Sequence, residues 1–205
     1  LAAPQVLIDI TRVSGLSEIA QDEGTLVIGA LCTHAQVADS PIVQRAAPAL
    51  SAAAGQIGDQ QVRNLGTIGG NLAHADPASD LPAVVLAFDA ELVVTGPDGR
   101  RSVRATSFFQ ELMTTALRPD EVLTAVRAPS LGVGSGSAYA KFENPASRYA
   151  IVGVAVVVNM NNGVCASAGI GVTGAGSVAV PARPALPNTR ATSGTDLIIR
   201  SVRCS

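Results

Sequence analysis

Short hydrophobic runs separated by turn residues dominate the first quarter of the chain and predict two strands and a helix. Apolar stretches bounded by turn residues predict strands at residues 6–10 and 25–31. The Ser-Pro pair at 40–41 is typical of a helix start, with serine at the N-cap and proline in the first turn. Apolar residues at helical spacing then predict a helix over residues 42–54, which Gly55 ends.

The middle of the chain alternates between polar and apolar segments. Residues 56–80 show little regular period and are rich in glycine, asparagine, aspartate and histidine, which favours a loop that carries binding groups. The pattern then predicts a short buried helix over residues 81–87 and a strand over residues 91–95. Residues 96–99, Gly-Pro-Asp-Gly, predict a turn. Residues 106–113 predict a further helix.

Strand-like patterns dominate the last third of the chain. A strand is predicted over residues 121–126 and ends by Pro129, and the glycine- and serine-rich residues 132–137 resemble a linker. Three antiparallel strands follow, with Asn-Asn-Gly at 161–163 as a hairpin turn. They are expected at residues 137–142, 150–160 and 164–172. The whole pattern predicts an α+β protein with a domain boundary near residues 131–136.

Composition excludes several classes of protein. With 47% hydrophobic and 15% charged residues, the chain can bury enough apolar surface to fold. A net charge of −2 and an aromatic content of 3% argue against nucleic acid as a partner. The longest apolar stretch, residues 151–158, is too short to span a bilayer, which predicts no transmembrane segment. Residues 1–4 do not form a signal peptide, and we interpret the chain as a piece of a longer protein.

The cysteines do not form a pattern that binds metal. Cys32, Cys165 and Cys204 are far apart, and no Cys-x-x-Cys pair or Cys/His ligand spacing is present. Disulfide, zinc and iron–sulfur frameworks are therefore poorly supported. Small buried thiols in a reducing cytoplasm explain Cys32 and Cys165, so we expect a cytoplasmic location.

The segment 63–80, Arg-Asn-Leu-Gly-Thr-Ile-Gly-Gly-Asn-Leu-Ala-His-Ala-Asp-Pro-Ala-Ser-Asp, carries the most chemistry. Gly69 and Gly70 let the backbone approach a ligand closely, and Thr67 and Asn71 flank them with a hydroxyl and an amide. Together these groups suit a diphosphate without needing a lysine. A Gly-Gly pair alone is more often a tight turn between packed elements, and the segment is neither a P-loop nor a GxGxxG fingerprint.

The whole string closely resembles the second flavin-contacting motif of the FAD-binding subunits of molybdenum hydroxylases. This is the xanthine dehydrogenase family, and the medium subunit of aerobic carbon monoxide dehydrogenase is especially similar. The resemblance covers about residues 4–176. Supporting matches lie, in the family's order, at residues 6–10, 28–30, 33–34, 57–64, 121–124 and 171–175.

The resemblance implies a fold and a division into segments. The fold would be the α+β, PCMH-type FAD-binding fold shared with vanillyl-alcohol oxidase-like enzymes, followed by the start of a smaller α+β C-terminal domain. The FAD-binding domain would cover residues 1–130, and residues 131–176 would begin a carbon monoxide dehydrogenase flavoprotein-like C-terminal domain. Residues 177–205, with four arginines and one aspartate after residue 176, form an atypical tail that is flexible or was never selected to fold.

The resemblance also implies which residues bind FAD. Thr67, Gly69, Gly70 and Asn71 would hold the diphosphate, and Asp80 would bind the ribityl region. Ile57 and Gly58 would line one side of the cofactor, Thr124 would lie near the ring system and Lys141 near the pyrimidine edge. Ile68, Ala73 and His74 complete the candidate set. No catalytic residue and no metal ligand is assigned.

Other interpretations of the same side chains remain open. Lys141, the only lysine in the chain, would by itself be taken as an exposed surface residue, and Tyr139 as a core or rim tyrosine that could instead cover a ring face. His34 is expected to satisfy local backbone groups. His74 lies in the motif, but its sequence differs from the motifs that bind flavin covalently through histidine. Asp76 and Asp80 make hydrolysis by general acid and base a weak alternative.

The family resemblance implies an electron-transfer role within a complex. A large subunit with the molybdenum cofactor would oxidise a substrate, two [2Fe–2S] clusters in a small subunit would relay electrons, and this chain would pass them through FAD to an acceptor. An earlier Gly-Gly-rich motif of the family, resembling AGGxS, is not present in this chain. Two other hypotheses are a flavin-dependent oxidoreductase that acts alone and a non-catalytic remnant that at most binds the partner subunits.

Overall fold

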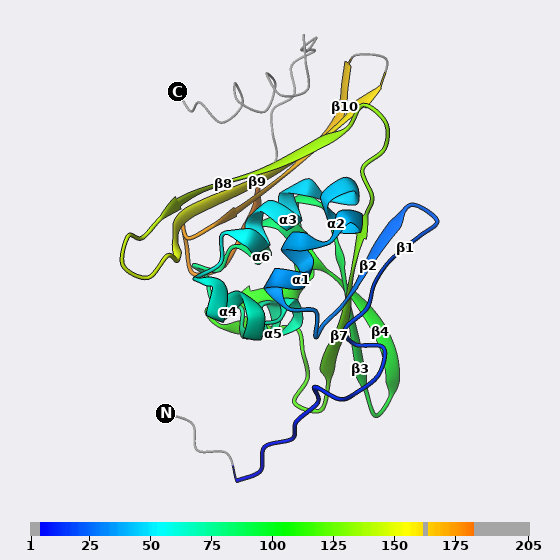
Figure 1. Ribbon diagram of the computed structural model, residues 1–205, viewed down its shortest axis with the longest axis vertical. Coiled ribbons are helices and arrows are strands. Elements are labelled where there is room, and N and C mark those ends of the chain that lie inside the picture. Colours follow the sequence, from blue (N-terminus) through cyan, green and yellow to red (C-terminus); the bar gives the residue numbers. More distant parts are fainter. Residues whose placement is uncertain (1–4, 162–163, 183–205) are drawn as a thin grey trace.

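A computed structural model describes residues 5–161 and 164–182. Two antiparallel sheets and a group of short helices make up the fold, with α3 and α6 packed beneath the second sheet and α4 at the outer edge of the helices (Figure 1). The strand order is β1-β2-β7-β3-β4 in the first sheet and β11-β10-β9-β8 in the second, with a small β5-β6 hairpin beside them. This arrangement confirms the α+β expectation. No helix in the described part of the chain has the length and apolar character needed to cross a bilayer.

The five-stranded sheet consists of three predicted strands and two unpredicted ones. Its strands are β1 (Ile19–Asp22), β2 (Thr25–Gly29), β7 (Val122–Pro129), β3 (Glu91–Gly96) and β4 (Gly99–Arg104). The apolar runs of β2, β3 and β7 and the turn at 96–99 were predicted correctly. β1 is only four residues long and β4 is rich in polar residues, and they form because tight turns fold them back onto β2 and β3. Glu23 and Gly24 supply the first of these turns with positive φ angles.

Residues 6–10 are not a strand, so that prediction was wrong. Val6, Leu7 and Ile8 are 73%, 86% and 81% exposed, and no strand of the described residues pairs with them. A β-prone sequence forms a strand only where a neighbour takes up its backbone hydrogen bonds.

The predicted helix over residues 42–54 is instead two helices, α2 (Pro41–Ala46) and α3 (Pro48–Gly55). Its start was predicted correctly, because the Ser40 hydroxyl accepts a hydrogen bond from the Val43 N–H at 3.4 Å. Pro48 has no N–H to donate and forces Ala47 out of the helical region, to φ −151° and ψ 67°. The helix is therefore interrupted at Ala47, and Gly55 ends the second part as expected.

Residues 56–80 are not an irregular loop, contrary to the prediction. They form α4 (Gln60–Leu65) and α5 (Ile68–His74), and a further unpredicted helix, α1 (His34–Asp39), precedes α2. Side chains cap all three helices: Asp59 caps α4, Thr67 caps α5, and Thr33 with Gln36 forms a capping box at α1. Capping stabilises short helices whose composition is unfavourable. The Thr-x-x-Gln pattern at 33–36 could have been found in the sequence.

The remaining short elements are α6, which precedes β3, and three elements between β4 and β7. The predicted buried helix is confirmed as α6 (Leu81–Ala87). The predicted helix over residues 106–113 was mostly wrong, since α7 spans only Ala105–Phe108. The chain then forms the hairpin of β5 (Phe109–Glu111) and β6 (Thr114–Thr115), with Met113 at φ +53° in its turn.

The second sheet confirms the three predicted C-terminal strands. Its strands are β8 (Gly136–Glu143), β9 (Ala150–Asn161), β10 (Val164–Thr173) and β11 (Val180–Ala182). The predicted hairpin turn at 161–163 lies mostly outside the described residues. β11 pairs with β10, so ordered structure continues past residue 177, and residues 183–205 lie outside the described part. The proposed boundary near residues 131–136 stays a prediction.

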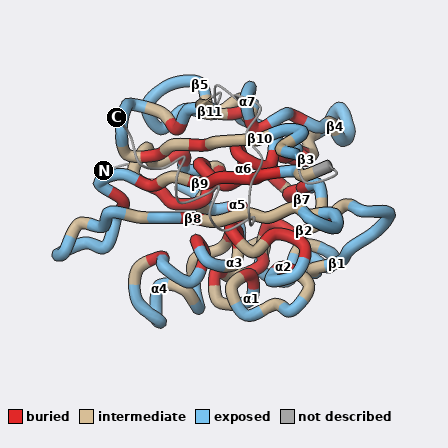
Figure 2. Tube along the Cα trace, turned by 90° about the horizontal axis from the view of Figure 1, so that it is seen from above, coloured by how far each residue is buried: buried red, intermediate tan, exposed pale blue. Residues whose placement is uncertain are grey.

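Both sheets and the helices share a hydrophobic core centred on α6. Every residue of α6 is buried, and buried positions gather around this helix in Figure 2. The second sheet approaches α6 very closely. A Cβ atom at Gly171 of β10 would lie 1.9 Å from the carbonyl oxygen of Ala83, and one at Gly169 would lie 2.0 Å from that of Ala87. Glycine is therefore required where the backbone of β10 lies directly against α6.

Candidate functional site

A buried ion pair joins the start of α6 to β8. Asp80 stands at the N-cap position of α6, but its side chain does not cap the helix and turns toward β8 instead. The Lys141 ammonium donates to Asp80 Oδ2 at 2.9 Å, and the Tyr139 hydroxyl donates to Asp80 Oδ1 at 2.5 Å. Tyr139 and Lys141 are two residues apart on one strand and so share a face. The side chains of Lys141 and Asp80 are only 1% and 5% exposed. Lys141 is therefore not an exposed surface lysine.

Burial shapes the acid–base properties of this cluster. It raises the pKa of Asp80 because the charged carboxylate loses solvation, while the donors from Tyr139 and Lys141 offset part of the rise. The pKa of Tyr139 is also raised, first by burial and then by the neighbouring Asp80 carboxylate. The hydroxyl of Tyr139 therefore stays protonated and acts as a donor.

A cavity of about 150 Å³ lies beside Asp80. It is lined by Ile57, Gly58, Val62, Asn71, Ser79, Asp80, Ser147, Arg148 and Tyr149. The buried Oδ1 atom of Asn71 has no hydrogen-bond partner, whereas its Nδ2 atom donates to Ser79 Oγ at 3.0 Å. An unpartnered buried acceptor is costly for a folded protein and marks a place where a ligand's donor would bind.

Gly69 and Gly70 lie in the first turn of α5 and have different surroundings. A Cβ atom at Gly69 would lie 2.5 Å from the Cβ of Ala30, so this glycine allows α5 to pack against the end of β2. Gly70 is exposed and would meet only the Thr67 hydroxyl, at 3.0 Å. The Gly69 N–H donates to the Ala30 carbonyl, and the Gly70 N–H donates to Thr67 Oγ1. Gly70, rather than Gly69, is the glycine open to a ligand.

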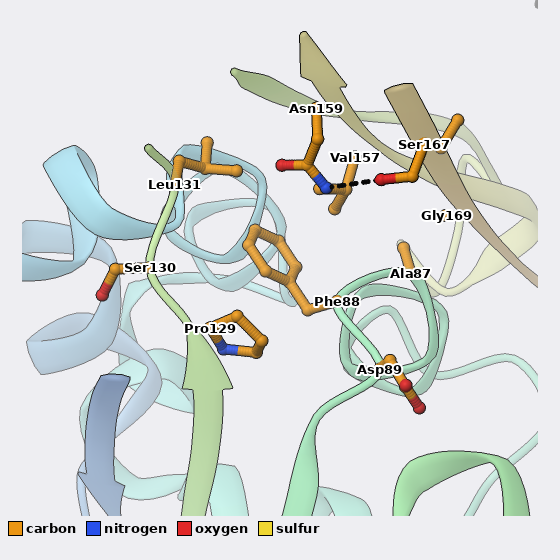
Figure 3. A pocket seen from close by; sticks show the side chains of 11 residues that line it. Ala87, Phe88, Asp89, Pro129, Ser130, Leu131, Val157, Asn159, Ser167 and Gly169 are labelled. Carbon is orange, nitrogen blue, oxygen red and sulfur yellow. Dashed lines mark hydrogen bonds between the residues drawn. The ribbon is translucent and has the colours of Figure 1, made fainter. Parts of the chain in front are cut away.

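A larger cavity lies elsewhere, between the end of α6 and the second sheet. It has a volume of about 380 Å³, and Phe88 lies between the segment 129–131 and the β9–β10 pair in Figure 3. A hydrogen bond from Asn159 Nδ2 to Ser167 Oγ, 3.0 Å long, crosses one side of it. None of the candidate cofactor-binding residues lines this cavity.

Comparison with known proteins places the chain in a family. A family profile described as the FAD binding domain in molybdopterin dehydrogenase matches residues 1–131. The chain belongs to this family. It is 39% identical over 181 residues to the 6-hydroxypseudooxynicotine dehydrogenase complex subunit alpha of Paenarthrobacter nicotinovorans, covering 88% of this chain and 61% of that protein. It is 43% identical over 157 residues to the carbon monoxide dehydrogenase medium chain of Hydrogenophaga pseudoflava, covering 77% and 55%.

Solved structures show the same fold. A carbon monoxide dehydrogenase from Hydrogenophaga pseudoflava that lacks the Mo-pyranopterin moiety of its cofactor superimposes with a TM-score of 0.84 at 40% identity, covering 88% of this chain and 63% of that chain. Quinoline 2-oxidoreductase from Pseudomonas putida 86 gives a TM-score of 0.78 at 33% identity, covering 86% and 61%. The chain spans about three fifths of the length of the relatives it matches. The expected PCMH-type FAD-binding fold is thereby confirmed, with FAD as the cofactor of the family.

The structure brings only part of the candidate set to the cavity of this FAD-binding domain. Ile57, Gly58, Asn71 and Asp80 line it together. Lys141 contacts Asp80 but is not part of the lining. The other candidates lie apart from it: Thr67, Gly69 and Gly70 at the start of α5, Ile68 in the core, Ala73 and His74 at the end of α5, and Thr124 in β7. The Thr124 hydroxyl is within hydrogen-bond distance of Thr95 Oγ1 and the Val93 carbonyl.

Five lining residues were not predicted from the sequence, and three of them belong to the turn between β8 and β9. Ser147, Arg148 and Tyr149 close the cavity from that turn, and Val62 and Ser79 complete the lining. Arg148 adopts φ +58° and donates to the carbonyl of Gly58 at 3.3 Å. The Asn-Pro pair at 144–145, between two predicted strands, was the sequence signal for a turn that could carry binding groups.

His34 is buried beneath the connection between α4 and α5. Its backbone N–H donates to the Gly66 carbonyl at 2.9 Å, but its buried Nδ1 atom has no partner, so the expectation that the His34 ring satisfies local backbone groups is not confirmed. Burial lowers the pKa of His34 from 6.5 to about 4. The folded state therefore resists protonation of this ring.

Acidification is expected to destabilise the domain through His34. Between pH 6.5 and about 4 the unfolded chain binds a proton at this residue while the folded chain does not, so stability falls as the pH is lowered through this window. The loss is expected to reach up to roughly 3 kcal/mol. Urea unfolding from pH 7 to pH 4 checks this. His34→Leu should show a shallower loss than the wild type, and parallel curves would contradict the assignment.

Proposed function

We propose that this chain is the FAD-binding part of an electron-transfer subunit of a molybdenum hydroxylase. In this proposal a small partner subunit delivers electrons from [2Fe–2S] clusters, and a large partner subunit with the molybdenum cofactor oxidises the substrate. Bound FAD supplies the redox chemistry, accepting electrons and passing them to an external acceptor. Family membership and the relatives named as medium chains support the proposal.

The observation that carries the proposal is the unpartnered Asn71 Oδ1 at a cavity that Asp80 also lines. Asn71 offers an acceptor without a donor, and Asp80 has lone pairs that Tyr139 and Lys141 leave free. Both therefore suit a hydroxyl-bearing ligand such as the ribityl chain of FAD. The cavity volume of about 150 Å³ is below the roughly 300–1,000 Å³ of pockets that enclose a drug-sized ligand, so it would hold one part of the cofactor.

The other candidate residues have supporting roles in this proposal. Ile57 and Gly58 form one wall of the cavity, and Gly70 and Thr67 provide an open backbone surface for the diphosphate. Gly69 acts by allowing α5 to pack on Ala30. Ile68, Ala73 and His74 are part of α5 and help to shape the site, and Thr124 on β7 would lie near the ring system. Lys141 acts through Asp80, because its charge and its hydrogen bond lower the pKa of that carboxyl against the effect of burial.

We also propose a cytoplasmic location. Cys32 is a buried free thiol and Cys165 is a partly exposed one, as expected for a protein from a reducing compartment.

Replacing Asn71 by leucine is expected to weaken FAD binding on the order of tenfold, the effect of losing about one hydrogen bond to the ligand. The chain is titrated with FAD, and binding is followed by flavin fluorescence and by absorbance near ~450 nm retained after desalting. Leucine has a similar volume, so the variant is expected to keep the wild-type fold, which circular dichroism checks.

Asn159→Leu is the matched control. Asn159 makes the same bond to a serine hydroxyl, also 3.0 Å long, but at the larger cavity. The control should bind FAD like the wild type. Weaker FAD binding in Asn159→Leu with normal binding in Asn71→Leu would indicate that FAD binds at the larger cavity instead. A wild-type chain that retains no flavin would contradict FAD binding by this polypeptide.

A further inference from the structure

The hydrogen bond from Tyr139 to Asp80 has no role yet in the proposed cofactor site. Tyr139 lies in β8, is 8% exposed, and reaches across to Asp80, which precedes it by 59 residues in the sequence. A buried hydroxyl needs a partner, but a bond to a backbone carbonyl would satisfy it equally well. Here it donates to one oxygen of the ionisable group that lines the cavity.

Small or well-placed residues on the neighbouring strands β9 and β10 leave space for the phenol of Tyr139 to reach Asp80. A Cβ atom at Gly153 of β9 would lie 2.3 Å from the Tyr139 hydroxyl oxygen and 2.8 Å from Thr173 Cγ2. Any larger residue at this position would displace the phenol. Thr173 of β10 has its hydroxyl 2.7 Å from the carbonyl oxygens of Pro77 and Ser79, so it fixes the backbone just before Asp80.

The two donors from β8 leave part of Asp80 free. An ionised carboxylate has about four lone-pair positions on its two oxygens. Tyr139 occupies one position on Oδ1 and Lys141 one on Oδ2. Since Asp80 also lines the cavity, the unoccupied positions are those available to a ligand.

We propose that Tyr139 is a positioning residue, whose hydroxyl holds the Asp80 carboxylate so that its free lone pairs accept hydrogen bonds from hydroxyl groups of the bound cofactor. Gly153 provides the space for this contact. The inference rests on the proposed function, because it assigns Asp80 as the acceptor for that ligand. Tyr139 itself acts only through Asp80.

The Tyr139 hydroxyl should also affect how cofactor binding depends on pH. Its hydrogen bond lowers the pKa of Asp80, so removal of the hydroxyl raises that pKa further. Cofactor binding that needs the carboxylate is lost as the pH falls through this pKa. Without the hydroxyl, binding is therefore lost at a higher pH.

Few other charged groups surround Asp80. Lys141 on β8 lowers the pKa of Asp80 and Glu143 on the same strand raises it, while Arg148 shares the cavity. His74 lies in the last turn of α5. The facing strands β9 and β10 and the helix α6 carry no charged residue.

The test compares FAD affinity as a function of pH in the wild-type chain and in Tyr139→Phe, which keeps the ring and removes the hydroxyl. We expect the midpoint of the acid loss of affinity to move upward by about one pH unit, with a change of less than about threefold on the alkaline side. A structural role alone would raise the dissociation constant equally at every pH. Equal midpoints would overturn the proposal.

Gly153→Ala tests the same contact from the neighbouring strand. Its added methyl displaces the phenol without removing it, so the midpoint should move in the same direction as in Tyr139→Phe. A normal midpoint in this variant, in a folded chain, would overturn the role of Gly153. Absence of FAD binding in the wild type would reject the proposed function, whereas normal wild-type binding with no midpoint shift in Tyr139→Phe rejects only the positioning role.

Discussion

Replacing Lys141 by methionine is expected to lower the free energy of unfolding by about 3–5 kcal/mol, the range for removing one partner of a buried ion pair. Methionine fills a similar volume but cannot donate a hydrogen bond or carry charge. The Asp80 carboxylate, 5% exposed, would then keep its charge in the interior with only the Tyr139 hydroxyl as a donor. Urea unfolding at pH 7 measures the loss.

An exposed ion pair provides the control for this prediction. Arg118 and Asp98 form an ion pair with side chains 59% and 90% exposed, so Arg118→Met should cost less than about 1 kcal/mol. The pH dependence gives a second check. Since the pKa of Asp80 is raised further in Lys141→Met, its carboxyl becomes neutral as the pH falls, and the difference from the wild type should shrink. Equal losses in the two variants would show that the Lys141–Asp80 pair contributes no more than a surface pair.

Replacing Gly171 by alanine is expected to cost more than about 3 kcal/mol, at or above the upper range for overpacked cores. The added Cβ would lie 1.9 Å from the carbonyl oxygen of Ala83 and 2.8 Å from its carbonyl carbon. Both are backbone atoms of the fully buried helix α6, so no side-chain rotation can relieve the overlap. The second sheet would have to move away from α6, which opens the shared core. Thermal unfolding measures the loss.

Gly136→Ala is the matched control, because Gly136 also lies in a strand of the second sheet but has no atom within 4 Å of the position that an added methyl would take. It should change stability by less than about 0.5 kcal/mol. If Gly171→Ala is as stable as Gly136→Ala, then β10 and α6 do not pack as closely as the structure shows. Loss of soluble protein in Gly171→Ala alone agrees with the prediction.

The sequence predicted those elements whose signals are local. The strands β2, β3, β7, β8, β9 and β10 and the helix α6 follow from apolar runs bounded by turn residues. Local patterns gave wrong predictions where strand pairing or tertiary packing determines the secondary structure. Residues 6–10 have a strand-like sequence without a neighbouring strand. The short β1 and the polar β4 lack an apolar run and are held in place by tight turns. The break at Ala47 is different, because Pro48 is a local signal that a continuous helix over residues 42–54 contradicts.

The candidate site also contains residues that the sequence indicated and residues that only the fold brings to it. The segment 63–80, as a string of residue types, indicated the family, and Asn71, Asp80, Ile57 and Gly58 proved to line one cavity. The different roles of Gly69, which packs against Ala30, and Gly70, which is exposed to a ligand, are set by contacts with elements distant in the sequence. The same is true of Arg148 and Tyr149, which close the cavity. Periodicity carries no information about such contacts.

The sequence by itself therefore determined the family, the cofactor class and most of the strands, because these follow from residue types at fixed spacing. Only the tertiary structure decided that Lys141 is buried against Asp80 and that Tyr139 completes the cluster. The three residues meet because β8 packs beside the start of α6, across some sixty residues of intervening chain. A buried charge is stable only with a partner at hydrogen-bond distance, and that partner is set by the fold rather than by neighbouring residues.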